Sequence, residues 1–166
     1  MRSITTLPAK GVYTLLIFVP EEICLNVGSL GMQRFPKGYY AYTGSALGRG
    51  ASSLNIRVQR HSRKAKTKFW HIDYLLAHED VLITSVLTAQ TDENMECETN
   101  SRIKHGLDAE ILIEGFGSSD CRQNCRSHLL FLGEKNVKEG ITKTYTEKFG
   151  SEYVVQLQLM QYSHSK

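Results

Sequence analysis

No stretch of this sequence is both long enough and apolar enough to cross a membrane. The longest uninterrupted apolar run covers residues 15–19, whereas a membrane-spanning helix needs about 20 such residues. The first eight residues also lack the apolar segment that is typical of a secretory signal peptide. We therefore expect a soluble, cytoplasmic protein without a membrane partner.

A large excess of charge is absent as well. The chain carries 20 basic and 17 acidic residues, a formal net charge of +3, which by itself favours no class of partner. The distribution is more informative, because acidic residues are missing between Arg57 and Lys68, where six basic residues lie. Such a run attracts phosphate groups and releases their counterions, although a solvated basic loop has the same composition.

Cysteine is scarce, with four residues in the chain, and a cytoplasmic protein keeps such thiols reduced. Cys121, Cys125 and His128 have a spacing that could bind zinc in a structural or interaction domain. A structural zinc ion needs a fourth ligand and usually has more closely paired ligands. Reduced, partly buried thiols are therefore the favoured interpretation, and a zinc-binding structural domain is the alternative.

The length of 166 residues fits a single domain, since a chain of ~150 residues buries roughly 70% of its surface on folding. Residues 11–19, 23–30 and 39–43 predict three strands, with a turn-rich connection at 31–38. Consecutive strands with short links predict an antiparallel meander. The expected fold is α+β and sandwich-like: a small central antiparallel sheet that begins with this meander and is flanked by helices. Further along the chain, the apolar spacing predicts helices at 51–63, 69–76 and 94–106, strands at 81–88 and 128–132, and an edge strand or helix at 153–160.

Arg57 and His61 are four residues apart on the helix predicted at 51–63, so both side chains project from one face. A guanidinium can hold a phosphate through two parallel hydrogen bonds. An imidazole can orient or protonate a reacting oxygen near neutral pH. The pair suits phosphodiester chemistry, although this spacing also occurs by chance on many surface helices.

Two tyrosines precede this helix on predicted strands. Tyr13 ends the triplet Gly-Val-Tyr on the first strand, and Tyr42 begins the triplet Tyr-Thr-Gly at the end of the third strand. A tyrosine on a strand usually packs its ring against the core and keeps its hydroxyl group in contact with water. The two tyrosines are followed by the helix with Arg57 and His61 and then by an acidic helix. This order along the chain indicates that these residues form one site.

In this order the motifs resemble those of the GIY-YIG nuclease family. The two triplets, the helical Arg57 and His61, and the acidic segment around Glu96 match the family's pattern, with Thr43 departing from the usual aliphatic residue. Segments 44–48, 69–75 and 115–121 resemble the Uri-type branch of small uncharacterised proteins. The resemblance spans residues 9–132, which would form a nuclease core within one domain of residues 1–166, with residues 133–166 as a C-terminal extension.

The resemblance implies an endonuclease that hydrolyses phosphodiester bonds in DNA with one Mg²⁺ or Mn²⁺ ion. Glu96 would bind the ion, with Glu98 as the alternative. The side chains of two helix residues that are two positions apart point about 200° apart, so only one of these carboxylates can face Arg57. Tyr13 would act as general base, which requires a pKa lowered by nearby cations. Arg57 would stabilise charge on the phosphate, and Tyr42 and His61 would position water and phosphate.

The same resemblance indicates DNA as the partner, with a homodimer or a second protein supplying specificity. Many members of the family have an asparagine near the end of the core that contributes to the site. This asparagine has no clear match here, and Ser118, Ser119, Asp120 or Asn100 would replace it. A catalytically degenerate DNA-binding module of the same fold is therefore an alternative function. The residues expected to contact DNA are Arg49, Arg60, Arg63, Lys64, Lys66 and Lys68, and the possible auxiliary site residues are Ser45, Trp70, His71, Asp73, Ser119 and Asp120.

Overall fold

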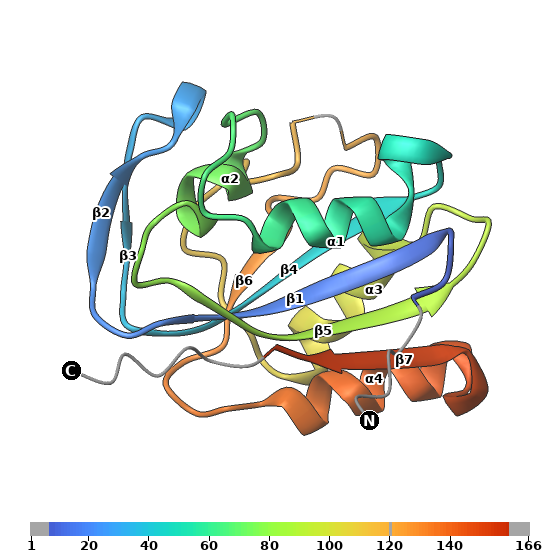
Figure 1. The fold of residues 1–166 in the computed structure, drawn as a ribbon. Helices are drawn as coiled ribbons and strands as arrows, with labels where there is room; N and C mark the ends of the chain where they lie inside the picture. The colour runs from blue at the N-terminus through green and yellow to red at the C-terminus, as the bar shows by residue number, and fades with distance from the viewer. Residues whose placement is uncertain (1–6, 120, 160–166) are drawn as a thin grey trace.

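The structure is a computed structural model that describes residues 7–119 and 121–159. Within these ranges the chain forms seven strands and four α-helices (Figure 1). The strands are β1 (Gly11–Val19), β2 (Ile23–Asn26), β3 (Met32–Phe35), β4 (Gly38–Ala46), β5 (Leu82–Gln90), β6 (Leu129–Phe131) and β7 (Val154–Gln158). The helices are α1 (Leu54–Ser62), α2 (His71–Leu76), α3 (Glu96–Gly106) and α4 (Lys138–Phe149), with short 3-10 turns at Gly28–Leu30, Gly50–Ser52 and Ser151–Tyr153.

A five-stranded sheet with the order β6-β4-β1-β5-β7 forms the centre, and all of its pairs are antiparallel. Successive side chains of a strand point to opposite faces, so β1 contributes to two cores. Leu15 and Ile17 pack under α1 and α2, whereas Val12 and Leu16 pack against α3 and α4. Figure 1 shows the helices on both faces of this sheet. The prediction of an α+β fold with a helix-flanked antiparallel sheet is confirmed.

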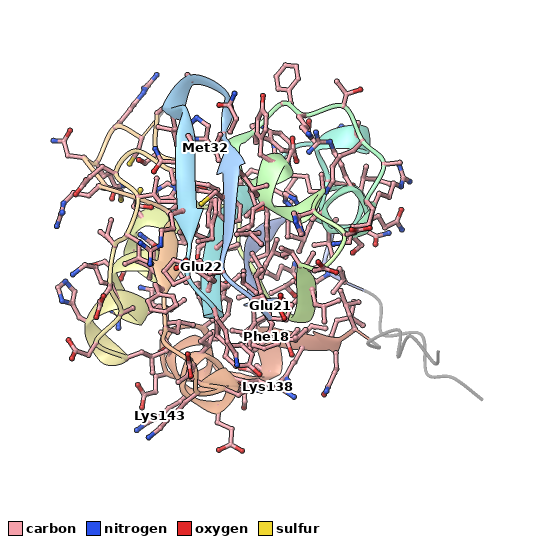
Figure 2. The ribbon with its side chains drawn as sticks, turned by 90° about the vertical axis from the view of Figure 1, so that its left-hand side faces the viewer. Phe18, Glu21, Glu22, Met32, Lys138 and Lys143 are labelled. Carbon is pink, nitrogen blue, oxygen red and sulfur yellow. The ribbon has the colours of Figure 1, made fainter. Side chains whose placement is uncertain are left out.

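The predicted three-stranded meander is wrong. β1 pairs with β4 along its whole length, and β2 and β3 form a separate two-stranded hairpin. The segment 31–38, predicted as a turn-rich connection, contains β3. One face of β2, with Ile23 and Leu25, packs on the core while the other is exposed, so the hairpin covers the sheet end rather than extending the sheet (Figure 2). β4, whose nine residues match the nine of β1, takes the place beside the central strand β1.

The remaining elements lie close to the predicted ones, with shorter helices at α1 and α2. The C-terminal apolar run forms β7, which pairs with β5 at the sheet edge. The sequence pattern did not predict α4, because its buried apolar stripe consists of Ile141 and Tyr145 alone. Residues 138–158 thus add one strand to the edge of the sheet and one helix that packs on its face. No helix in the described ranges combines the length and the apolar character needed to cross a bilayer.

Candidate functional site: a tyrosine–histidine cluster beside a cysteine–histidine cluster

Tyr13 lies on β1 directly opposite Gly44 of β4. A Cβ atom at Gly44 would be 2.6 Å from the Tyr13 hydroxyl oxygen, well inside van der Waals contact. The glycine of the Tyr-Thr-Gly triplet therefore leaves the space that the Tyr13 ring occupies. The glycine at position 44 thus has a steric reason that is independent of any chemistry.

The hydroxyl of Tyr13 is hydrogen-bonded to Nε2 of His61 on α1, at 2.8 Å. Both side chains are buried, with exposed fractions of 2% and 1%. Burial, followed by the charge of Lys66, lowers the pKa of His61 to about 3, so the imidazole is neutral at physiological pH. Its Nδ1 has no hydrogen-bond partner among the described residues, which leaves one buried polar atom unsatisfied beside the tyrosine.

The expected lowering of the Tyr13 pKa is not found. Burial raises the pKa of Tyr13, and the nearby guanidinium of Arg57 offsets only part of that effect. The pKa of Tyr42 is raised as well, first by burial and then by Tyr13. Desolvation disfavours the phenolate more strongly than one cation favours it. Both phenols are therefore neutral in this structure.

Arg57 lies at the rim of the same cluster. Its Nη1 donates to the carbonyl of Ser45 at 2.6 Å, and its guanidinium lies over the Trp70 ring, 5.2 Å from the centroid. Trp70 also packs 6.0 Å from the His61 ring. The indole and the β4 carbonyl thus hold Arg57 where its charge acts on the Tyr13 hydroxyl.

The two candidate carboxylates at the start of α3 have different surroundings. Glu96 is close enough to raise the pKa of both Tyr13 and Tyr42, and its side chain is 24% exposed. Glu98 points away, with a contact of 2.9 Å to Lys148 and one of 3.2 Å to Arg102. The ion pair with Lys148 lowers the pKa of Glu98. Glu96 is therefore the carboxylate that faces the tyrosines.

The basic run contains lysines with local partners that its composition did not indicate. Lys64 Nζ donates to the carbonyls of Leu76, His78 and Val81. Lys66 Nζ donates to the carbonyls of Arg60 and His61 at the end of α1, where a helix leaves acceptors unsatisfied. These two lysines hold the connection between α1 and β5 together. Arg49, Arg63 and Lys68 are exposed, and the Nζ of Lys68 lies 5.4 Å from the centroid of the Tyr74 ring.

Asp73 and Arg60 form a two-pronged ion pair. Arg60 donates to both carboxylate oxygens, at 2.8 and 2.7 Å, and Asp73 also accepts from the backbone N–H groups of Phe69 and Trp70. Burial opposes ionisation, but the Arg60 hydrogen bonds and these N–H groups lower the pKa of Asp73 overall. The pair positions Trp70 against α1, which is a positioning role rather than a catalytic one.

The other auxiliary candidates are distributed around the cluster. His71 Nδ1 accepts from the Gly117 N–H at 3.0 Å, and Ser45 contacts Asn94 at 3.3 Å. Ser119 is exposed in a turn, and Asp120 lies outside the described residues. Asn100 donates to the Ser127 carbonyl at 2.8 Å, so it anchors the loop before β6.

Thr43, the departure from the aliphatic residue of the motif, is buried on the opposite face. Its hydroxyl lies 2.8 Å from that of Thr14, its partner across the strand pair. Thr14 in turn lies 2.7 Å from the hydroxyl of Tyr145 on α4. The hydroxyl groups of Thr43, Thr14 and Tyr145 thus contact one another in sequence. The fold accommodates the departure on the face opposite Tyr13.

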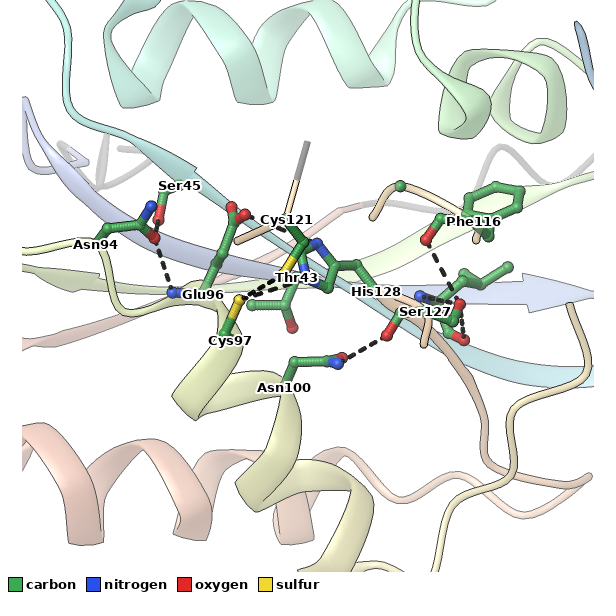
Figure 3. A network of polar contacts seen from close by, with 12 residues as sticks. Thr43, Ser45, Asn94, Glu96, Cys97, Asn100, Phe116, Cys121, Ser127 and His128 are labelled. Carbon is green, nitrogen blue, oxygen red and sulfur yellow. Dashed lines mark hydrogen bonds and ion pairs between the residues drawn. The ribbon is translucent and has the colours of Figure 1, made fainter. Parts of the chain in front are cut away.

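Three cysteines and one histidine come together on the far side of Glu96. Cys97 on α3 meets Cys121, Cys125 and His128 from the loop before β6, and the four ligand atoms lie within 4.8 Å of one another. Cys97 Sγ is 3.2 Å from Cys121 Sγ and 3.7 Å from His128 Nε2 (Figure 3). All three cysteines are free thiols.

The turn that presents this loop depends on backbone conformations that few residues adopt. Asn124, between Cys121 and Cys125, has φ 57°, which asparagine tolerates better than most side chains. Gly117 has φ 67°, and a Cβ atom there would be 2.9 Å from the Tyr42 ring. The loop therefore brings Cys121 and Cys125 together and also packs closely on Tyr42. It contacts both the cysteine–histidine cluster and the tyrosine–histidine cluster.

Cys97 is the residue that the sequence reasoning missed. It lies 24 positions before Cys121, beyond the spacing of a compact zinc motif, so nothing local connected it with the loop. The available signal was its position next to Glu96 at the start of a predicted helix. Cys24, the remaining cysteine, is exposed on β2.

Comparison with known proteins bears on the family. A family model described as a domain of unknown function, DUF123, matches residues 12–151. A comparison with curated proteins gave no match, and a comparison with solved structures gave none either. The matched range contains both clusters, from Tyr13 to His128. Because the match covers most of its 166 residues, this chain belongs to the DUF123 family of domains of unknown function.

Proposed function

We propose that this chain is a zinc-binding domain in which Cys97, Cys121, Cys125 and His128 hold one Zn²⁺ ion. The observation that carries the proposal is the convergence of four ligand atoms within 4.8 Å. Zinc–sulfur bonds of about 2.3 Å and zinc–nitrogen bonds of about 2.0 Å place tetrahedral ligand atoms roughly 3.5–3.8 Å apart. The contacts of 3.2 and 3.7 Å from Cys97 are close to that geometry.

A set of three thiolates and one imidazole is typical of zinc, and a site closed by four protein ligands is typical of a structural role. The segment between α3 and β6 covers residues 107–128, and its described residues, all but residue 120, have a single isolated bridge, Glu110 to Phe131. Loops of this length without regular structure are uncommon in compact domains. A zinc ion would cross-link this loop to the start of α3 and so supply the order that the backbone does not.

Metal analysis of protein purified without chelator tests this proposal. We expect about one zinc ion per chain in the parent and in Cys24→Ser, and little in Cys97→Ala, because a site with three ligands binds structural zinc weakly. Chelation should also speed trypsin cleavage after the exposed Arg122 and Arg126. Less than about half a zinc ion per chain in the parent would overturn the proposal.

Hydrolysis of phosphodiester bonds in DNA is the second candidate function, and a specific observation favours it. The Tyr13 hydroxyl is hydrogen-bonded to a neutral His61 while Arg57 and Glu96 both act on it. These are the residue types, in the chain order, that the resemblance to GIY-YIG nucleases associates with DNA cleavage. The family match assigns no activity, so this function is a proposal drawn from the cluster.

The neutral pair suggests how such a site would handle the proton of an attacking water. The Tyr13 oxygen would take that proton while its own hydroxyl proton moves to His61 Nε2, so neither side chain needs to be charged beforehand. The water oxygen bonds to phosphorus as the bond to the 3′ oxygen breaks. Arg57 would offset the negative charge that develops on the phosphoryl oxygens.

Glu96 fits a Mg²⁺ ion, because this ion often takes one or two carboxylates and keeps several waters, and the Glu96 side chain is partly exposed to solvent. When bound, the ion would supply Lewis-acid stabilisation of the phosphate and of the leaving oxygen. Holding the carboxylate beside the tyrosines is the contribution of α3.

A panel of labelled duplex, branched and single-stranded DNA with Mg²⁺ or Mn²⁺ tests the second candidate. Tyr13→Phe should lower cleavage roughly 10²–10⁴-fold and leave DNA binding intact. Tyr145→Phe, which removes a buried hydroxyl on the opposite face, is the matched control and should cleave like the parent. Salt-sensitive binding without products would instead support the degenerate DNA-binding module, and equal cleavage by Tyr13→Phe and the parent would refute the assigned site.

A further inference from the structure

Glu96 and Cys97 are consecutive residues in the first turn of α3, and they reach different neighbours. Successive side chains on an α-helix diverge by about 100°. Cys97 Sγ belongs to the four-ligand cluster, whereas the charge of Glu96 acts on Tyr13 and Tyr42. One helical turn therefore connects the cysteine–histidine cluster with the tyrosine–histidine cluster.

His128 makes a second connection between them. Its Nε2 is 3.7 Å from Cys97 Sγ, and its Nδ1 is 3.7 Å from Oε1 of Glu96. The imidazole thus contacts both a sulfur atom and the carboxylate, and dashed lines in Figure 3 connect these residues. His128 is 2% exposed, so the ring has little freedom to turn towards solvent.

We propose that Glu96 is the outer carboxylate of the zinc centre, and that the loaded centre in turn holds Glu96 beside Tyr13 and Tyr42. The inference rests on the proposed zinc binding. In the loaded centre, Glu96 would accept the Nδ1–H of His128, whose Nδ1 now lies 3.7 Å from Oε1, and the Nε2 lone pair would be left for the metal. A metal-bound histidine almost always donates its other N–H to a carboxylate, a carbonyl or water.

The distances support this assignment and indicate what loading would change. An N–H···O hydrogen bond is usually about 2.9 Å long, so the present separation of 3.7 Å would shorten when zinc fixes the ring. The backbone of Gly117 competes for the ring, because a hydrogen bond with it offsets part of the lowering of the His128 pKa by burial. The charged carboxylate is the stronger acceptor, and it is therefore expected to set the ring orientation.

Zinc affinity of the full chain, measured by competition with a chromophoric chelator, tests the coupling. Loss of an outer partner typically costs roughly 10–100-fold in metal affinity, so Glu96→Ala should raise the zinc Kd by that factor. Glu96→Gln, which keeps a weaker acceptor of the same shape, should have a smaller effect. Glu98→Ala is the matched control, because it removes a carboxylate from the same helical turn whose partners are Lys148 and Arg102.

The outcomes separate the two proposals. If the parent binds zinc and Glu96→Ala binds it as tightly as Glu98→Ala, the coupling is overturned while the zinc site stands. A parent that binds no zinc overturns the zinc site itself. Nitrogen NMR of the loaded parent gives a readout that needs no variant: a metal bound through Nδ1 of His128 overturns the proposal, because that nitrogen would then have no proton to donate to Glu96.

Discussion

Acidification is expected to destabilise this protein through His61. The imidazole has an ordinary pKa of 6.5 and, because it is buried, a pKa of about 3 in the folded chain. The unfolded chain therefore binds a proton first as the pH falls. Stability is lost below about pH 6.5 with a slope of about 1.4 kcal/mol per pH unit, down to about pH 3.

The loss between pH 7 and pH 5 comes to about 2 kcal/mol when this slope is integrated from the ordinary pKa. The value depends little on how far below about pH 4 the folded pKa lies, because the folded state is unprotonated throughout this window. It is a substantial fraction of the roughly 5–15 kcal/mol that stabilises a typical domain. The effect should therefore be measurable.

Urea denaturation of the parent and of His61→Gln at a series of pH values measures the effect. The glutamine does not titrate, so the parent should lose about 2 kcal/mol more than the variant on going from pH 7 to pH 5. Protonation of the other histidines occurs in both proteins and cancels. Equal losses in the two proteins would refute a buried, neutral His61. If the variant does not fold, imidazole proton NMR of the parent decides the matter: a His61 titration near its ordinary pKa of 6.5 would contradict the structure.

Two further substitutions test the positioning contacts around the cluster. Asp73→Asn should lower the free energy of unfolding by about 3 kcal/mol at neutral pH, because it leaves the partly buried Arg60 without its counter-charge. The difference from the parent should narrow as the pH falls through the lowered pKa of Asp73, because the carboxylate of the parent is then protonated as well. Asp80→Asn at an exposed turn should stay within about 0.5 kcal/mol, and a similar cost for both would contradict the ion-pair argument. Lys64→Met should cost about 2 kcal/mol in urea denaturation, since three backbone carbonyls lose their donor. Lys68→Met on the exposed part of the same run should be near neutral, and equal losses would show that Lys64 has no special role.

Much of the fold follows from local pattern. The apolar run at 11–19 predicts the central strand because its side chains are buried on both faces, and the spacing of Arg57 and His61 places both on one side of α1. The meander is wrong for a physical reason. Strand pairing is decided by matched length and by competition between partners, and β4 matches β1 better than β2 does.

The candidate site was only partly predictable. The two tyrosines, Arg57 and His61 were identified from their order, and the structure brings them together with Glu96. The direction of the Tyr13 pKa was not predictable, because it depends on how completely the surrounding layers exclude water. The hydrogen bonds of Lys64 Nζ show the same point, because the composition of a basic run does not reveal which backbone carbonyls its lysines reach.

The sequence by itself determined the fold class, most of the elements and which residues share a strand or a helix face, because these depend on side-chain periodicity over a few positions. The tertiary structure alone decided that Cys97 joins Cys121, Cys125 and His128. It also decided that Glu96, rather than Glu98, turns towards the tyrosines. The physical reason is that these contacts join segments 24 or more positions apart, whose meeting depends on the path of the loops and on which surfaces exclude water.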